Sequence, residues 1–154
     1  MPPAPVRQPQ AVLFMCSRNV VRSPMAAALF GQIFGRAVYV GSAGIHKGEI
    51  DPFAVAAMGE IGIDISRHKS KTIEELEEWE GLNFDLIVTL APEAHHRALE
   101  LTRLSGVEVE YWATSDPTAV EGNREQKLDA YRAVRDQLLT RIRERFVGTG
   151  TGNE

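Results

Sequence analysis

Residues 11–16, AVLFMC, form a continuous apolar run that opens into a polar, cationic turn and then into a periodic apolar segment. A short apolar run without alternation is typical of a strand buried on both faces of a parallel sheet. After the turn, Ser23-Pro24 predicts a helix start, with Ser23 as the N-cap and Pro24 at the first helical position. This order of strand, turn and helix favours an α/β fold, in which ligands bind beyond the carboxyl ends of the strands.

The rest of the chain repeats this alternation. Further strands are predicted at 37–44, 84–90 and 107–112, and helices at 24–35, 51–62, 71–82, 91–104 and 123–146. Such alternation favours a parallel sheet with helices on both faces, which is a three-layer α/β/α architecture. A chain of 154 residues is the size of one domain. We expect that domain to span residues 11–147, between a Pro-rich flexible tail at 1–10 and a Gly-rich one at 148–154.

The charge balance and the composition exclude several function classes. The formal net charge is −4, and no apolar run approaches the roughly 18 residues that span a bilayer, so we expect neither nucleic acid nor a membrane as partner. The single cysteine fits a reducing compartment, which predicts a cytoplasmic protein. His95 and His96 could suggest metal ligands, but adjacent helical residues point about 100° apart, so surface positions are favoured. We expect no metal or cofactor, and a monomer or weak dimer.

The turn after the first strand places a thiol and a guanidinium at its two ends. Cys16 lies at the base of the turn and Arg22 follows six positions later, just before a helix. The backbone N–H groups of such a turn form an anion site, and both the helix end and Arg22 favour the thiolate. Arg22 can also hold two oxygens of a tetrahedral oxyanion, so Cys16 is a candidate nucleophile. The alternative is a buried structural cysteine followed by a cationic surface turn.

These residues carry a resemblance to a known family. CSRNVVRSP resembles the phosphate-binding loop of the low-molecular-weight protein tyrosine phosphatases, a family that also includes thioredoxin-coupled arsenate reductases. GSAGI at 41–45, GIDISRHKSKTI at 62–73, FDLIVTL at 84–90 and a late Asp-Pro follow in the family's order. The resemblance implies a four-stranded parallel sheet flanked by helices, in agreement with the alternation described above.

The resemblance also implies roles for single residues. Cys16 would be the nucleophile, Arg22 the phosphate clamp, and Ser23 the hydroxyl that stabilises the thiolate and assists its departure from the phosphoenzyme. The phosphate would be bound by the whole loop, namely Ser17, Arg18, Asn19, Val20, Val21, Arg22 and Ser23. Asn19 matches a residue that the family holds by serine and histidine side chains, and Ser42 and His68 fall where those partners are expected. For His68 a surface position in a basic turn is the alternative.

A general acid is expected on a late loop. In the family this acid precedes a proline, and Asp116-Pro117 matches that place. The proline restricts Asp116 to extended conformations, which would hold its carboxyl at a fixed angle toward the site. Asp51-Pro52 is a competing match, but it stands at a helix entry, where Asp is a common cap. We therefore predict capping for Asp51 and catalysis for Asp116.

The chain departs from the family in three places. Arg18 replaces the usual loop glycine; this cation either favours anionic ligands or points to solvent. Val21 replaces the second loop cysteine of many family phosphatases, so a protective disulfide cannot form. Cys16 is then either open to irreversible oxidation or dependent on an external thiol. Thr118 and Ala119 stand where family tyrosine phosphatases often carry aromatic residues. A basic cluster near His68 would meet either an acidic partner or solvent; its members are Arg67, His68, Lys69 and Lys71.

The predicted function is hydrolysis of phosphomonoesters, of the protein-tyrosine-phosphate type, through a cysteinyl-phosphate intermediate. The expected partner is a phosphorylated protein, a small phosphomonoester or arsenate. The stretch YWATSDPTAVEG looks more like the arsenate reductase branch, but the disulfide relay of those enzymes needs three cysteines and this chain has one. Arsenate reduction would thus need a small thiol such as glutathione or mycothiol. A third hypothesis is a non-catalytic sensor that binds an oxyanion or a phosphoprotein.

Overall fold

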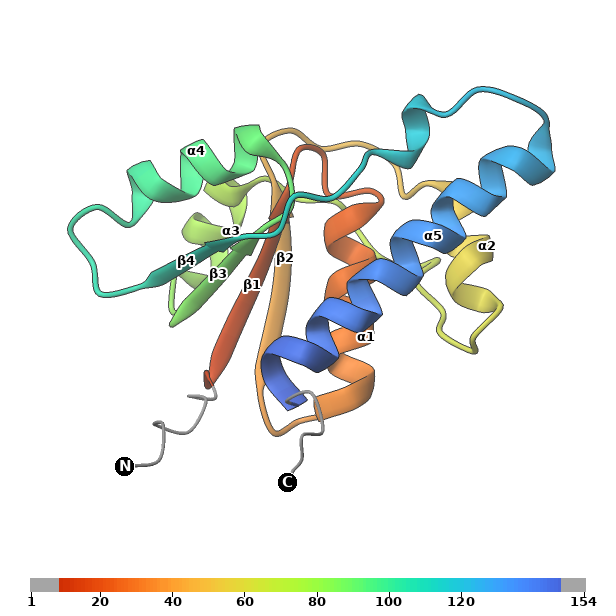
Figure 1. Cartoon of the computed structure of the whole chain (residues 1–154). Helices are drawn as coiled ribbons and strands as arrows, with labels where there is room; N and C mark the ends of the chain where they lie inside the picture. Colours follow the sequence, from red (N-terminus) through yellow and green to blue (C-terminus); the bar gives the residue numbers. More distant parts are fainter. Residues whose placement is uncertain (1–8, 148–154) are drawn as a thin grey trace.

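The computed structural model describes residues 9–147, so most of the two predicted tails, 1–8 and 148–154, lies outside the described residues. Four parallel strands form one sheet in the order β2-β1-β3-β4 (Figure 1). The strands are β1 (Ala11–Cys16), β2 (Tyr39–Gly44), β3 (Leu86–Thr89) and β4 (Glu108–Tyr111). The helices are α1 (Arg22–Phe34), α2 (Pro52–Gly59), α3 (Ile73–Glu80), α4 (Pro92–Leu101) and α5 (Arg124–Ile142). The predicted three-layer α/β/α architecture is confirmed.

Successive residues of β1 supply two separate cores. Val12 and Phe14 pack into the larger core with apolar residues of α1, α2 and α5, whereas Leu13 and Met15 pack with residues of α3 and α4. Figure 1 shows the same division, with α1, α2 and α5 on one side of the sheet and α3 and α4 on the other. Because β1 is an inner strand with both faces covered, its sequence is continuously apolar. The strand therefore ends at a fixed place, with Cys16 at its carboxyl end.

The start of α1 differs from the prediction. The helix begins at Arg22, its N-cap is Val21, and no side chain caps it. Ser23 was predicted to be the cap, and this is wrong: its hydroxyl lies 2.9 Å from Cys16 Sγ inside the turn. At the start of α2 the prediction is confirmed, because the Asp51 side chain accepts a hydrogen bond from the N–H of Phe53.

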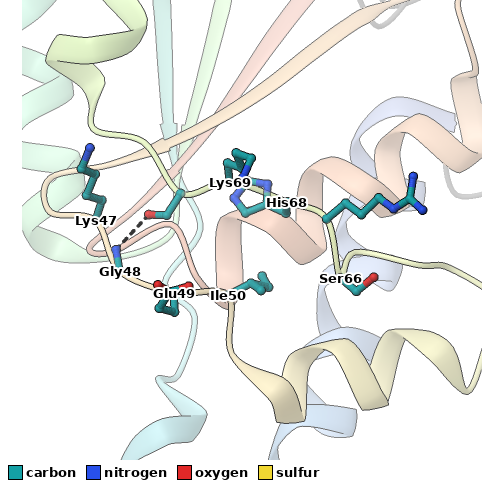
Figure 2. Close-up of a pocket in the computed structure, with 9 residues that line it drawn as sticks. Lys47, Gly48, Glu49, Ile50, Ser66, His68 and Lys69 are labelled. Atoms are coloured by element: carbon teal, nitrogen blue, oxygen red, sulfur yellow. Dashed lines mark hydrogen bonds between the residues drawn. The ribbon is translucent and has the colours of Figure 1, made fainter.

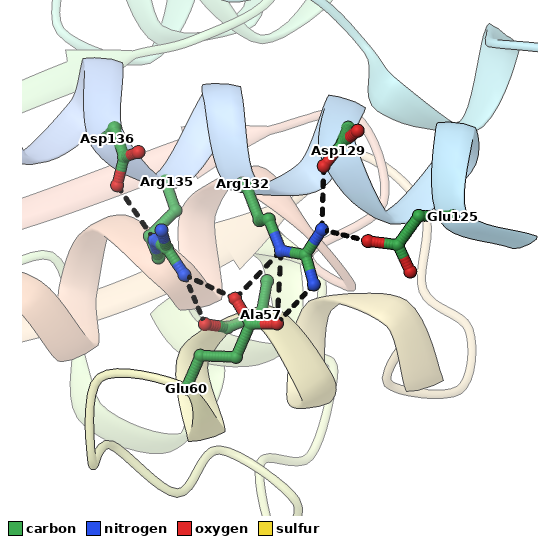
Figure 3. A network of polar contacts seen from close by, with 7 residues as sticks. All are labelled: Ala57, Glu60, Glu125, Asp129, Arg132, Arg135 and Asp136. Atoms are coloured by element: carbon green, nitrogen blue, oxygen red, sulfur yellow. Dashed lines mark hydrogen bonds and ion pairs between the residues drawn. The ribbon is translucent and has the colours of Figure 1, made fainter.

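The helix α5 is fixed to the end of α2 by charged side chains (Figure 3). Glu60 accepts hydrogen bonds from the guanidinium groups of Arg132 and Arg135, and Arg135 also donates to the carbonyl oxygen of Ala57. The bonds from Arg132, with a further contribution from Arg135, lower the pKa of Glu60 to about 2. After α5, the π-helical turn Arg143–Val147 buries Phe146. The predicted helix to residue 146 therefore ends in this different turn.

Candidate active site

The loop after β1 surrounds the sulfur of Cys16, whose side chain is only 2% exposed. Cys16 Sγ accepts a hydrogen bond from the backbone N–H of Asn19 at 3.2 Å and lies 2.9 Å from Ser23 Oγ. Ser23 Oγ itself accepts a bond from Asn19 Nδ2 at 2.8 Å, which leaves the hydroxyl proton free to point at the sulfur. The sulfur therefore meets two donors, an arrangement that suits a thiolate.

Asn19 is the centre of the loop's support. Its backbone has φ of 60°, in the left-handed region that few residues other than Gly and Asn occupy. The buried side chain accepts bonds at Oδ1 from the N–H of Lys71 and from His68 Nε2, and His68 Nε2 also contacts the Asn19 carbonyl oxygen. Because both partners are acceptors, Nε2 carries the proton. Burial and the nearby charge of Lys71 lower the pKa of His68, which favours this neutral, donating ring.

The structure brings His68 to Asn19 but does not bring Ser42 there. Ser42 is paired with Phe14 in the sheet, two residues before the end of β2, and its side chain lines a hollow beside Ala27 and Ala28 of α1. Among residues 9–147 it makes no hydrogen bond to Asn19. The further bond to Asn19 comes instead from the backbone of Lys71, which sequence patterns do not reveal because any residue type supplies an N–H.

Neighbouring segments hold the outer side of the loop. The Ser17 carbonyl oxygen accepts bonds from two backbone N–H groups at 2.8 Å, and the Arg18 carbonyl oxygen accepts one from the Ser70 hydroxyl at 2.8 Å. Gly44 touches the loop so closely that a Cβ there would lie 2.8 Å from the carbonyl carbon of Arg18. In the described part of the chain, the N–H groups of Arg18, Val20 and Val21 have no acceptor. They are available to an anion.

The three predicted catalytic residues meet around one small pocket of about 80 Å³. Its lining consists of Cys16, Ser17, Arg18, Val20, Val21, Arg22, Asp116 and Thr118. One Arg22 nitrogen donates to the carbonyl oxygen of Thr114 at 3.0 Å, which fixes the guanidinium and leaves further N–H groups for a ligand. The volume is well above the roughly 10–15 Å³ that a single water needs, so the pocket has room for a small oxyanion.

Asp116 lies in an exposed turn on the rim of this pocket. Its backbone is extended, with φ of −89° and ψ of 107°, as expected before a proline. Oδ1 accepts bonds from the N–H and the hydroxyl of Thr118 at 3.0 and 2.6 Å. Oδ2 has no hydrogen-bond partner among residues 9–147 and can carry a proton. Asp51 does not line the pocket; its second oxygen accepts a bond from the Tyr131 hydroxyl instead.

Other predictions concern the rest of the surface. Residues 9–147 contain no group of three or more His, Cys, Asp or Glu side chains that could hold a metal ion. His95 lies within 2.9 Å of the Thr89 hydroxyl and stacks on Tyr111. None of the helices in this part of the chain has both the length and the apolar character to cross a membrane. The cytoplasmic location and the monomeric or weakly dimeric state stay predictions.

The fold and the site define a class: an α/β domain with a buried cysteine at the base of the loop that joins its first strand to its first helix. The family model described as low molecular weight phosphotyrosine protein phosphatase matches residues 11–147. The chain is 37% identical to an arsenate reductase of Bacillus subtilis strain 168 over 140 residues, which cover 90% of this chain and 96% of that protein. It therefore belongs to the low-molecular-weight phosphotyrosine protein phosphatase family.

Solved structures agree with this assignment. A mutant arginine phosphatase with a phosphorylated active-site serine superposes with a TM-score of 0.70 at 27% identity, covering 90% of this chain and 93% of that one. An arsenate reductase in the phosphate-binding state gives a TM-score of 0.67 at 27% identity, covering 90% and 97%. The relatives thus include both phosphatases and arsenate reductases, and both indicate an enzyme of this phosphatase-like class.

Proposed function

We propose that this protein hydrolyses phosphomonoesters, of the protein-tyrosine-phosphate type, through a cysteinyl-phosphate intermediate. The observation that carries the proposal is the meeting of Cys16, Arg22 and Asp116 around one oxyanion-sized pocket. The arrangement supplies a nucleophile, an anion clamp and a proton donor, which are the three groups that ester cleavage at phosphorus needs.

In the first step, Cys16 Sγ attacks phosphorus while the bond to the ester oxygen breaks. The free loop N–H groups and Arg22 stabilise the charge on the transferring oxygens. Asp116, protonated at Oδ2, gives its proton to the leaving oxygen, so that an alcohol or phenol departs. The products of this step are the free alcohol, a cysteinyl phosphate and an ionised Asp116.

In the second step, water attacks the phosphorus and the bond to sulfur breaks. Asp116, now ionised, takes a proton from that water and returns to its starting form. The Ser23 hydroxyl, 2.9 Å from Sγ, donates to the departing thiolate. Inorganic phosphate leaves and Cys16 is regenerated, so the cycle consumes only water and the ester.

Arsenate reduction is the second candidate, and the sequence identity to an arsenate reductase supports it. Cys16 Sγ would attack arsenic while one arsenic–oxygen bond breaks and that oxygen leaves as water, which gives a sulfur–arsenic adduct. Because the chain has no second cysteine, an external thiol must attack Sγ, so that arsenite leaves with two electrons and a mixed disulfide remains. A second thiol would restore Cys16. Membership of this family indicates an enzyme and speaks against a non-catalytic sensor.

One experiment separates these candidates. Hydrolysis of para-nitrophenyl phosphate is measured between about pH 5 and pH 8 for the wild type and Cys16→Ser, beside arsenate turnover with glutathione or mycothiol. We expect hydrolysis by the wild type and a loss of about 10⁴-fold or more in Cys16→Ser, because removal of a nucleophile is costly. A thermal melt confirms that the variant is folded. An inert wild type that turns over arsenate with thiol would replace the phosphatase proposal by the reductase.

A further inference from the structure

A second and larger hollow, of about 750 Å³, lies beside the catalytic loop. Two chain segments form its walls, one after β2 and one before α3, as the labelled side chains of Figure 2 show. Its lining consists of Lys47, Gly48, Glu49, Ile50, Ser66, Arg67, His68, Lys69 and Ser70. We call this hollow the basic groove. None of the proposed catalytic steps uses it.

The basic groove is joined to the catalytic loop at Arg18. Ser70 Oγ donates to the Arg18 carbonyl oxygen at 2.8 Å and accepts from the Gly48 N–H at 3.2 Å, the bond drawn in Figure 2. The Arg18 guanidinium lies beside Gly48, where an added Cβ would stand 3.4 Å from one of its nitrogens. Arg18 also lines the pocket of Cys16. A substrate chain leaving that pocket past Arg18 would therefore enter the groove.

Positive charge is concentrated along this path. Arg18, Arg67 and Lys69 are exposed, and none of them has an ion-pair partner among residues 9–147. Lys47 is already paired with Glu75 at 2.7 Å, and Glu49 is the one carboxylate of the lining. The whole chain carries a net charge of −4, so this cationic surface contrasts with the rest of the protein. Such a patch attracts an anionic partner and repels a cationic one.

We infer that the basic groove binds an acidic polypeptide segment that flanks the phosphorylated residue. The inference rests on the proposed function and narrows its substrate class from phosphomonoesters in general to phosphoproteins with Asp and Glu near the phosphate. The pocket of about 80 Å³ accepts the phosphate, and the groove of about 750 Å³ has room for neighbouring side chains. The lining of the Cys16 pocket contains no aromatic side chain, and Thr118 stands where family tyrosine phosphatases often carry one. The pocket itself therefore discriminates little between esters, and the contacts of the flanking segment in the groove supply the selectivity.

The test compares three substrates at low salt: a short phosphotyrosine peptide flanked by Asp and Glu, the same peptide with Asn and Gln, and para-nitrophenyl phosphate. Exposed charge pairs are individually weak, so we expect kcat/KM to favour the acidic peptide by about tenfold over the neutral one. The preference should shrink toward about 1 M salt, where surface charges are screened. The double variant Arg67→Glu/Lys69→Glu should lose the preference and still hydrolyse para-nitrophenyl phosphate at the wild-type rate.

The matched control is Arg36→Glu/Arg103→Glu. These two exposed arginines precede β2 and β4, at the amino ends of the parallel strands, whereas Cys16 lies at a carboxyl end. Neither has an ion pair within the described residues. The control variant changes the net charge equally and should keep the preference. Equal kcat/KM for both peptides, or an equal loss in the control, would overturn the inference while the phosphatase proposal stands. Absence of turnover with all three substrates would overturn the proposed function and this inference with it.

Discussion

The turn that carries Cys16 and the turn that carries Asp116 line one pocket, yet they are fixed by different means. Around Cys16, hydrogen bonds come from segments far away in the sequence, such as those from His68 and from the Lys71 backbone to Asn19. Among residues 9–147, Asp116 has hydrogen-bond partners only within its own turn: its side chain accepts from Thr118 and its carbonyl oxygen from the N–H of Ala119. The side chain of the nucleophile is buried, whereas that of the acid is exposed.

This difference matches what each group does. A sulfur that must meet phosphorus and loop N–H groups at once depends on fixed geometry, and supporting hydrogen bonds supply it. A proton donor must reach leaving groups of varied size and then admit water, so a turn with few long-range bonds suits it. The comparison predicts that damage to the loop lowers stability and activity together, whereas damage at Asp116 lowers activity alone.

Apart from replacement of the nucleophile itself, the largest effect on turnover is expected from Asp116→Asn. The amide keeps an oxygen for Thr118 but has no proton to give, so kcat/KM for an alkyl phosphate should fall by about 10²- to 10³-fold. For para-nitrophenyl phosphate, whose leaving group needs little protonation, the loss should be about tenfold or less. The measurement is kcat/KM for both substrates, together with a thermal melt that should not change.

Asp51→Asn is the matched control for this prediction. Asp51 also precedes a proline and caps a helix, but it does not line the pocket. Its variant should hydrolyse both substrates at the wild-type rate. If Asp116→Asn slowed hydrolysis of the alkyl and the aryl ester equally, Asp116 would not be the proton donor. The looser attachment of its turn could then not be explained by proton donation.

A smaller effect on turnover, but a clear one on stability, is expected from Asn19→Ala. The change removes the bonds to Ser23, Lys71 and His68 and leaves an alanine in the left-handed region, at a total cost of about 2–4 kcal/mol. The melting temperature should fall by about 5–15 °C. Asn19→Gly removes the same bonds without the backbone strain, so its free energy of unfolding should be about 1 kcal/mol higher than that of Asn19→Ala. An unchanged melting temperature in Asn19→Ala would mean that this side chain does not hold the loop.

The smallest effect is a pH dependence of stability from His68. Its pKa is lowered in the folded protein from the ordinary value of 6.5, by burial first and by Lys71 second. The unfolded chain therefore binds a proton at a higher pH than the folded one, so stability is complete above about pH 6.5 and falls below it. Thermal melts from about pH 7.5 to pH 5 should show this decline.

The variant His68→Gln, which keeps an N–H donor, should flatten the decline seen in those melts. His96→Gln is the control, because His96 lies on the exposed side of α4, where its side chain is 80% exposed. If both variants showed the wild-type decline, the titrating group would lie elsewhere and His68 would not be the neutral donor described above.

Much of the fold was predictable, because the spacing of apolar residues and the residue types at turns determine strands and helices locally. Every predicted strand and helix is present. The clearest strand predictions were the continuously apolar runs 11–16 and 84–90, because such a run must be buried on both faces of a sheet. The ends were less accurate. Ser23 has the residue type of an N-cap, but its hydroxyl pairs with the sulfur of Cys16. Local helix propensities do not include such a tertiary contact. Competition from a tertiary contact therefore moved the helix start.

The site divides in the same way. Cys16, Arg22 and Asp116 were predictable because their chemistry requires particular side chains, and the structure places all three around one pocket. The carbonyl oxygen of Thr114, which fixes Arg22, had no signal in the sequence, since every residue has such an oxygen. Ser42 has the expected residue type at the expected spacing, but the direction of its side chain depends on its register beside Phe14.

Because the chain contains one cysteine, a reagent that alkylates thiols can modify each chain at one sulfur only, that of Cys16. In the folded protein this sulfur is buried at the base of the pocket, so the rate of labelling reports access to the pocket without any substrate. Occupancy of the loop by an oxyanion covers that sulfur and slows the labelling. A scale of affinities for phosphate, arsenate and related ions can thus be read from labelling rates, independently of which ester is the natural one.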